Sequence, residues 1–270
     1  MSNKKNTRIV IITGDSHRHR AFAAYLGELF EVQGIVFEEK RSPAPLQSMT
    51  ALVERHIAER DEAERRYFAR DYSGFLRSHT HLNVSRGESN SPRVFEWVRS
   101  LRPDYVVLFG SSIIEDPLLG SYHDRMINIH LGLSPYYRGS ATNFWPLVHG
   151  KPECVGATIH LAERKVDAGA LLAQVRPDIQ HTDSAHDIGC KAIKAGTAAM
   201  ARAISAYAAG TVTGRLQEPE ALRAGILCKH SEFSEEAVQA LHSEFEGGMI
   251  PRYLAKKAER DARYPLVELP

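Results

Sequence analysis

A short run of β-branched residues near the start of the chain constrains the fold most strongly. Residues 8–13 read Arg-Ile-Val-Ile-Ile-Thr and end at Gly14, a pattern typical of a buried parallel strand. Apolar side chains then recur at helical spacing over residues 17–30, and residues 32–37 have the pattern of a second strand. Strand, helix and strand in this order predict a right-handed βαβ unit within an α/β protein.

Further elements follow the same logic along the chain. Their patterns predict helices over residues 92–102, 184–208 and 234–245, strands over 103–109 and 126–130, and a hairpin of 155–161 with 170–175. Residues 40–90 carry alternating charges with few strand signals, which predicts an exposed helical insertion with a solvated face. We expect one catalytic domain over residues 1–210 and a short C-terminal extension over 211–270, too short for a second full domain.

Composition excludes several classes of protein. The net charge is +1 and hydrophobic residues make up 43% of the 270 residues, so no bulk field favours nucleic acid or a membrane surface. The three cysteines lie far apart and no apolar stretch reaches the roughly 20 residues of a membrane span. Motifs of dehydrogenases, P-loop NTPases and α/β-hydrolases are absent, and no set of His and Cys completes a metal site. We therefore expect a cytoplasmic enzyme without a structural metal.

One segment carries most of the chemical information. It reads Asn128-Ile-His-Leu-Gly-Leu-Ser-Pro-Tyr-Tyr-Arg-Gly139. On a strand, Asn128 and His130 share one face, and Gly132 on that face is expected to leave space beside them. Acyl transfer between amines needs an oxyanion donor, a proton shuttle and a group that orients the shuttle. An amide and an imidazole supply the first two, and Asp167, in a turn between the two hairpin strands, is a candidate for the third.

At this point the sequence resembles a known family. Asn-x-His, then Leu-Ser-Pro-x-x-Arg-Gly, then Val-Asp-Ala-Gly about forty residues later, resembles the formyltetrahydrofolate-dependent formyltransferases. The resemblance covers roughly residues 100–200 well and residues 8–37 more weakly. It implies a Rossmann-like, doubly wound, mostly parallel sheet, the catalytic residues Asn128, His130 and Asp167, and 10-formyltetrahydrofolate as co-substrate. In the implied reaction Asn128 and a protonated His130 stabilise the oxyanion, and Asp167 favours the imidazolium.

The resemblance also implies binding residues. The folate pteridine would contact the loop after residue 107 and the turn around Asp167, with Phe109 and Ile113 as apolar walls; the residues are Leu108, Phe109, Gly110, Ser111, Ile113 and Val166. The acceptor would contact the loop after the first strand and the aromatic segment after the catalytic strand; the residues are Gly14, Arg18, Ser134, Tyr137, Arg138 and Trp145.

Several alternatives stay open from the residues alone. Asn128 and His130 could be buried strand polars, Asp167 a turn residue, and residues 14–20 a helix cap instead of a phosphate site. The aromatic cluster near Trp145 could be core or a stacking wall. We expect a small-molecule amine as acceptor, with a nucleotide-linked amino sugar favoured, no tRNA, and a homodimer left open. A formyltetrahydrofolate hydrolase, a glycinamide ribonucleotide transformylase-like enzyme and a non-catalytic folate-binding paralogue are the competing hypotheses.

Overall fold

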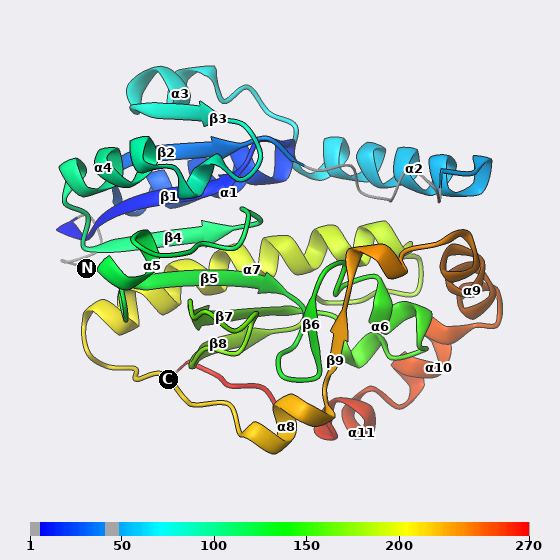
Figure 1. Ribbon diagram of the computed structural model, residues 1–270. Coiled ribbons are helices and arrows are strands. Elements are labelled where there is room, and N and C mark those ends of the chain that lie inside the picture. Colours follow the sequence, from blue (N-terminus) through cyan, green and yellow to red (C-terminus); the bar gives the residue numbers. More distant parts are fainter. Residues whose placement is uncertain (1–5, 41–48, 270) are drawn as a thin grey trace.

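The computed structural model describes residues 6–40 and 49–269, and its central feature is a seven-stranded sheet (Figure 1). The strand order is β3-β2-β1-β4-β5-β7-β8; the first five strands are parallel, and β7 is antiparallel to both of its neighbours. The strands are β1 (Arg8–Gly14), β2 (Glu31–Glu38), β3 (His81–Val84), β4 (Tyr105–Phe109), β5 (Met126–Leu131), β7 (Ala157–Leu161) and β8 (Leu171–Val175).

Strand β1 is central because both of its faces are apolar. Ile9 and Ile11 belong to the core beneath one face of the sheet, and Val10 and Ile12 belong to the core on the other. The helices that cover the two faces are α1 (His17–Gly27) and α7 (Ala185–Ala208) on the first, and α4 (Pro92–Leu101) and α5 (Leu118–Ser121) on the second. Helix α7 packs along β5, β7 and β8 (Figure 1). The Ser184 side chain caps it by accepting a hydrogen bond from the Asp187 N–H.

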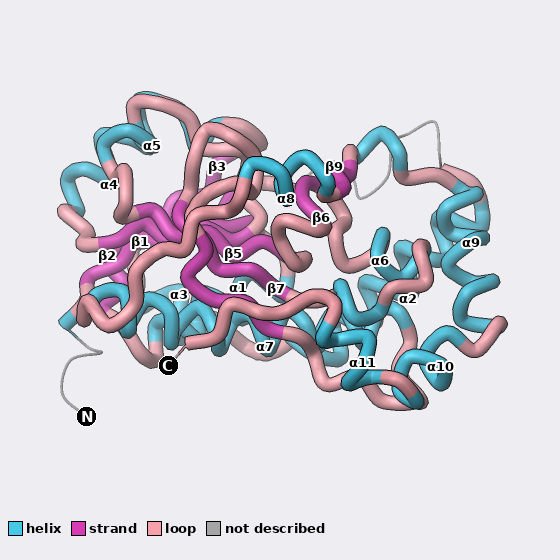
Figure 2. The backbone as a smooth tube through the Cα atoms, turned by 90° about the horizontal axis from the view of Figure 1, so that it is seen from below, coloured by secondary structure: helices cyan, strands magenta, loops and turns pink. Residues whose placement is uncertain are grey.

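A group of helices lies beside the sheet (Figure 2). It consists of α2 (Ala51–Phe68), α6 (Trp145–Val148), α9 (Glu235–Glu246), α10 (Met249–Ala255) and α11 (Lys257–Ala262), with the short helix η4 (Pro152–Cys154). Helix α2 presents charged residues to solvent, but it packs Val53 against Phe233 and Val238 of the C-terminal segment. The insertion and the extension, far apart in sequence, therefore build one helical layer.

Helix α2 confirms the predicted helical character of the insertion, but two other features of this region were not predicted. Residues 81–84 form β3, an edge strand of the main sheet, within the segment predicted as a helical insertion; residues 41–48 of that segment lie outside the described residues. The last sixty residues hold more than the one predicted helix, because α10 and α11 follow α9 and pack on η4. The remaining elements are α3 (Ser73–Ser78), η3 (Glu88–Asn90), β6 (Tyr137–Gly139), α8 (Pro219–Ala224), β9 (Ile226–Cys228) and η5 (His230–Glu232). None of the helices among the described residues is long and apolar enough to cross a membrane.

The helical layer makes stability depend on pH through His56. Its ring is 7% exposed and lies 4.5 Å from the His186 ring, centroid to centroid. Burial, with His186, His242 and Arg60, lowers the pKa of His56 to about 3 against the opposing Glu59. In the unfolded chain the ring titrates near pH ~6.5, so below that pH the unfolded state binds the additional proton.

Between about pH 6.5 and about pH 5, we expect the free energy of unfolding to decrease as the pH is lowered. This decrease is expected to be steeper in the wild type than in a His56→Leu variant by about 1.4 kcal/mol per pH unit. Urea unfolding followed by circular dichroism measures both slopes. Parallel slopes would show that this ring is not held neutral in the folded protein.

Candidate active site

The pairing of β5 with β7 brings the first polar side chains together. Asn128 and His130 lie on the same face of β5, and the antiparallel register places His160 of β7 directly opposite Asn128. The Asn128 amide nitrogen lies 3.0 Å from His160 Nε2. His160 was not among the predicted site residues, because its contact depends on a register between strands that the sequence does not display.

The turn after β7 completes the set with Asp167, at the position predicted between the two hairpin strands. Its Oδ2 lies 3.2 Å from His130 Nδ1 and accepts a hydrogen bond of 2.8 Å from the Gly139 N–H. Its Oδ1 lies 3.5 Å from His160 Nε2. The structure therefore brings together the three predicted catalytic side chains, Asn128, His130 and Asp167, with His160 as a fourth member.

The protonation states follow from burial and from the partners of each group. Burial of the Asp167 carboxylate acts to raise its pKa, but the His130 ring and the Gly139 N–H favour the ionised form, and the net pKa lies below its ordinary value. Burial of the His130 ring lowers its pKa, which outweighs the raising effects of Asp167 and of the Tyr137 carbonyl. His130 is thus neutral at rest at neutral pH, and the predicted support of the imidazolium by Asp167 is present but smaller than the effect of burial.

Both ring nitrogens of His130 nevertheless face oxygen acceptors. Nε2 lies 3.0 Å from the Tyr137 carbonyl oxygen, and Nδ1 faces Asp167. Only the doubly protonated ring can donate to both, so taking up a proton improves the hydrogen bonding of the ring. A neutral imidazole whose protonated form is already provided with two acceptors is suited to receive a proton during a reaction.

The Asn128 amide is oriented by His160. The His160 Nδ1 lies 2.8 Å from the Leu161 carbonyl oxygen and must donate to it, which leaves Nε2 of the neutral ring as an acceptor. The Asn128 amide nitrogen donates one hydrogen there, and no second hydrogen bond of this amide occurs among the described residues. Asn128 is only partly buried, so its second N–H is available to a carbonyl oxygen of a ligand.

Three residues predicted to bind substrate are instead buried in the frame of the site. Ser134 is 1% exposed, Tyr137 is 2% exposed and Arg138 is 6% exposed. The Tyr137 carbonyl accepts from His130, and the Arg138 guanidinium donates to the carbonyl oxygens of Val166 and, at 2.8 Å, Leu222. Residues of the C-terminal segment contact Tyr137 and Arg138, and the three buried side chains offer no open surface.

The space predicted beside Gly132 is filled. A Cβ built on Gly132 would lie 2.8 Å from the Thr142 Cβ and 2.9 Å from His130 Nε2, and the Thr142 hydroxyl donates to the Leu131 carbonyl. The prediction that this glycine leaves room for a ligand is therefore wrong. It instead allows the chain segment that carries Thr142 to pack against the end of β5.

The loop after β4 only partly matches its prediction. Leu108 and Phe109 are buried in the cores on opposite faces of the sheet, and the Phe109 ring packs 5.0 Å from that of Phe22, so neither side chain can wall a ligand. Gly110, with φ +65°, turns the chain, Ser111 and the turn residue Val166 are partly exposed, and Ile113 is 60% exposed. The buried carboxylate of Glu38 accepts from the Ser112 N–H and hydroxyl, which holds this loop in place.

The predicted acceptor residues near β1 are arranged differently. Gly14 ends β1 beneath the His19 ring, and the Arg18 guanidinium forms an ion pair with the buried Glu64 of α2. This pairing withdraws Arg18 from the anion-binding role predicted for it. Trp145 is partly buried against Phe144, with ring centroids 5.3 Å apart, which favours the core alternative for this aromatic cluster.

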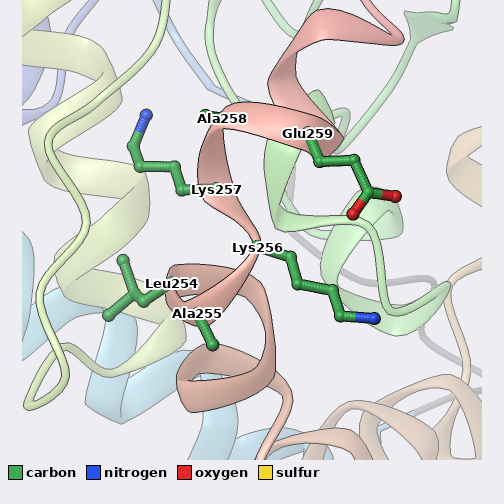
Figure 3. A pocket seen from close by; sticks show the side chains of 6 residues that line it. All are labelled: Leu254, Ala255, Lys256, Lys257, Ala258 and Glu259. Carbon is green, nitrogen blue, oxygen red and sulfur yellow. The ribbon is translucent and has the colours of Figure 1, made fainter.

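A hollow on the surface at the junction of α10 and α11 is separate from this site (Figure 3). Six consecutive residues, 254–259, line it, and the side chains of Lys256 and Lys257 point away from each other. Side chains that do not converge cannot position a reacting group. Within residues 6–40 and 49–269, no group of three His, Cys, Asp or Glu side chains is arranged to hold a metal ion.

Solved structures share this architecture. The phosphoribosylglycinamide formyltransferase of Anaplasma phagocytophilum superposes with a TM-score of 0.57 at 17% identity, covering 80% of this chain and 94% of that chain. A 4-N formyltransferase of Francisella tularensis superposes with a TM-score of 0.54 at 15% identity, covering 87% of this chain and 86% of that one. At these identities the likeness shows the fold alone, and it confirms the predicted Rossmann-like, mostly parallel α/β class.

Sequence comparison identifies the family. The methionyl-tRNA formyltransferases of Bacillus licheniformis and Bacillus subtilis are 34% identical over 125 residues and 32% identical over 127 residues. Each match covers 46% of this chain and spans only 39% of the length of the relative. The profile of the formyl transferase family matches residues 46–204, more than half of the chain, and this range contains Asn128, His130 and Asp167. The chain belongs to the formyl transferase family.

Proposed function

We propose that this protein transfers a formyl group from 10-formyltetrahydrofolate to the amine of a small metabolite. The observation that carries the proposal is the convergence of the Asn128 amide, the His130 imidazole and the Asp167 carboxylate at the end of β5. The family of the chain supports the reaction class. The solved structures with this fold include a glycinamide ribonucleotide transformylase and a sugar N-formyltransferase, and we therefore favour a small-molecule acceptor over tRNA.

Each of the three catalytic side chains has a defined part in the proposed reaction. The neutral acceptor amine attacks the formyl carbon, and the Asn128 N–H stabilises the oxyanion that develops. His130 takes a proton from the amine and becomes an imidazolium that donates to Asp167. The tetrahedral intermediate then breaks its bond to N10 of the folate, and the His130 imidazolium returns its proton to N10 and becomes neutral again. The products are the formamide and tetrahydrofolate, so atoms and protons balance.

The folate site proposed for this reaction lies between two loops. The backbone of Gly110 and Ser111 and the exposed Ile113 form one side, and Val166 next to Asp167 forms the other. An apolar wall combined with backbone polar groups suits a flat heterocycle with polar edges. A cytoplasmic location belongs to the same proposal, since 10-formyltetrahydrofolate and free thiols such as Cys154 suit a reducing compartment. Of the acceptors, we favour a nucleotide-linked amino sugar.

Incubation with 10-formyltetrahydrofolate and a panel of amines tests the proposal. The panel contains nucleotide-linked amino sugars, glycinamide ribonucleotide and amino acids, and mass spectrometry identifies the products. A formylated amine formed together with tetrahydrofolate supports the transferase. Free formate without formylated amine would replace the proposal by a hydrolase, and folate binding without turnover would replace it by a binding protein.

A further inference from the structure

The chain beyond α7 returns to the site and reaches the turn that carries Asp167. Arg215 pairs with Leu171 at the edge of β8 through two backbone hydrogen bonds of 2.8 Å. This pairing fixes the path of the next residues, and Gln217 enters the protein two positions later with 9% of its surface exposed. Arg215 and Gln217 lie outside residues 46–204, the part of the chain that matches the family profile.

The Gln217 amide contacts the backbone of the turn at Asp167 itself and at Gly169, two residues later. Its Nε2 donates to the Asp167 carbonyl oxygen at 3.0 Å and to the Gly169 carbonyl oxygen at 2.8 Å. Two carbonyl oxygens can only accept, so the amide must present its NH₂ group to them. Its own oxygen is buried and has no hydrogen-bond partner among the described residues, a cost that the fold carries at this position.

The turn needs such support because its backbone is strained. Asp167 has φ +49°, a left-handed conformation that residues other than glycine rarely adopt. Arg138 holds the preceding carbonyl, of Val166, from the side of β6. Gln217 holds the turn from the side of the C-terminal segment, so the conformation that aims the carboxylate at His130 is fixed from two directions.

We propose that Gln217 is a positioning residue for the transfer reaction, which sets the Asp167 carboxylate against the His130 ring through the carbonyls of its turn. This inference rests on the proposed function for its kinetic consequence. It assigns to the C-terminal extension a part in the active site, although none of its side chains touches the reacting atoms in the proposed reaction.

Two substitutions of Gln217 separate the hydrogen bonds from the packing. Gln217→Glu keeps the shape but brings a carboxylate against two carbonyl oxygens, and Gln217→Met keeps the length but removes both donors. We expect each variant to lower kcat by about 10- to 100-fold, because the Asp167 carboxylate is displaced from the His130 ring. The KM values are expected to change less than about 3-fold, because the residues proposed to bind the substrates are unchanged. Gln239→Glu, at an exposed position on α9, is the matched control and is expected to keep the wild-type kcat.

The His130 ring provides a second readout that does not require turnover. NMR titration of ¹³C-labelled histidine, with His130 assigned through the His130→Ala protein, reports the pKa of the ring. Asp167 raises that pKa, so a displaced carboxylate is expected to lower it in Gln217→Met, which introduces no charge, and not in Gln239→Glu.

The outcomes distinguish this inference from the proposed function. Wild-type titration and wild-type kcat in both variants would overturn the role of Gln217. So would a loss of kcat accompanied by a comparable increase in KM, a lower melting temperature and an unchanged His130 titration, since that describes a purely structural residue. If the wild type lacks transferase activity, the proposed function fails, while the titration still decides whether Gln217 positions Asp167.

Discussion

Replacing His130 with alanine is expected to lower kcat for formyl transfer by about 10²- to 10⁴-fold, the usual contribution of a positioned acid–base group. The ring contacts both the Asp167 carboxylate and the Tyr137 carbonyl, so its protonated form has two acceptors in place. Asn128→Ala is expected to cost about 10²- to 10³-fold in kcat, the effect of removing one oxyanion donor. Steady-state rates of tetrahydrofolate release measure both losses.

A matched control variant and a folding measurement distinguish a loss of catalysis from a loss of folding in the His130→Ala protein. His123 is 71% exposed in its side chain, and His123→Ala is expected to have the wild-type rate. Circular dichroism of the His130→Ala protein should retain the wild-type spectrum, because the ring sits in a polar site and not in one of the hydrophobic cores. A folded His130→Ala protein with a near-normal rate would remove His130 from the chemistry.

Gly169→Ala is expected to lower the free energy of unfolding by about 3 kcal/mol, which corresponds to a loss of roughly 6 to 12 °C in melting temperature. A Cβ at this position would lie 1.8 Å from the Leu161 carbonyl oxygen and 2.9 Å from its carbon. Both contacts are to backbone of the β7–β8 hairpin, so no side chain can rotate away. The hairpin would have to open next to Asp167.

Gly189→Ala is the control for this change. A Cβ at Gly189 meets nothing within 4 Å, and the residue lies inside α7, so the change is expected to stabilise the protein by about 0.5 to 1 kcal/mol. Thermal unfolding followed by circular dichroism compares the two variants. Equal melting temperatures for Gly169→Ala and the wild type would show that the hairpin does not close as tightly as the structure has it.

The sequence predicted the parts of this protein whose pattern is local. The β-branched run of β1, the amphipathic α4 and the capped α7 each carry their own signal, and their bounds agree with the structure to within a few residues. Strand β3 was missed because a four-residue edge strand with two polar residues resembles the charged segment around it. The helices after α9 were missed because their burial depends on contacts with η4, eighty or more residues away.

The site residues also fall into those with a local sequence signal and those placed by residues distant in sequence. Asn128 and His130 share a face because of strand periodicity, which the sequence displays. The hairpin pattern placed Asp167 in a turn, and the resemblance singled it out as the catalytic carboxylate. His160 and Gln217 could not be predicted, since one depends on an antiparallel register and the other on the path of the chain after α7. Arg138 was predicted to contact the acceptor; its burial could not be predicted, because the residues around Leu222 that contact it are distant in sequence.

A crystal structure with a hydrolysis-stable 10-formyl folate analogue tests the central claim most directly. We predict that the pteridine lies against the backbone of residues 110–113 and that the formyl oxygen lies about 3 Å from the Asn128 amide nitrogen, a hydrogen-bond distance. The formyl carbon would then lie beside His130 and Asp167. A folate bound elsewhere, for example in the hollow at residues 254–259, with Asn128 still paired only with His160, would contradict the account.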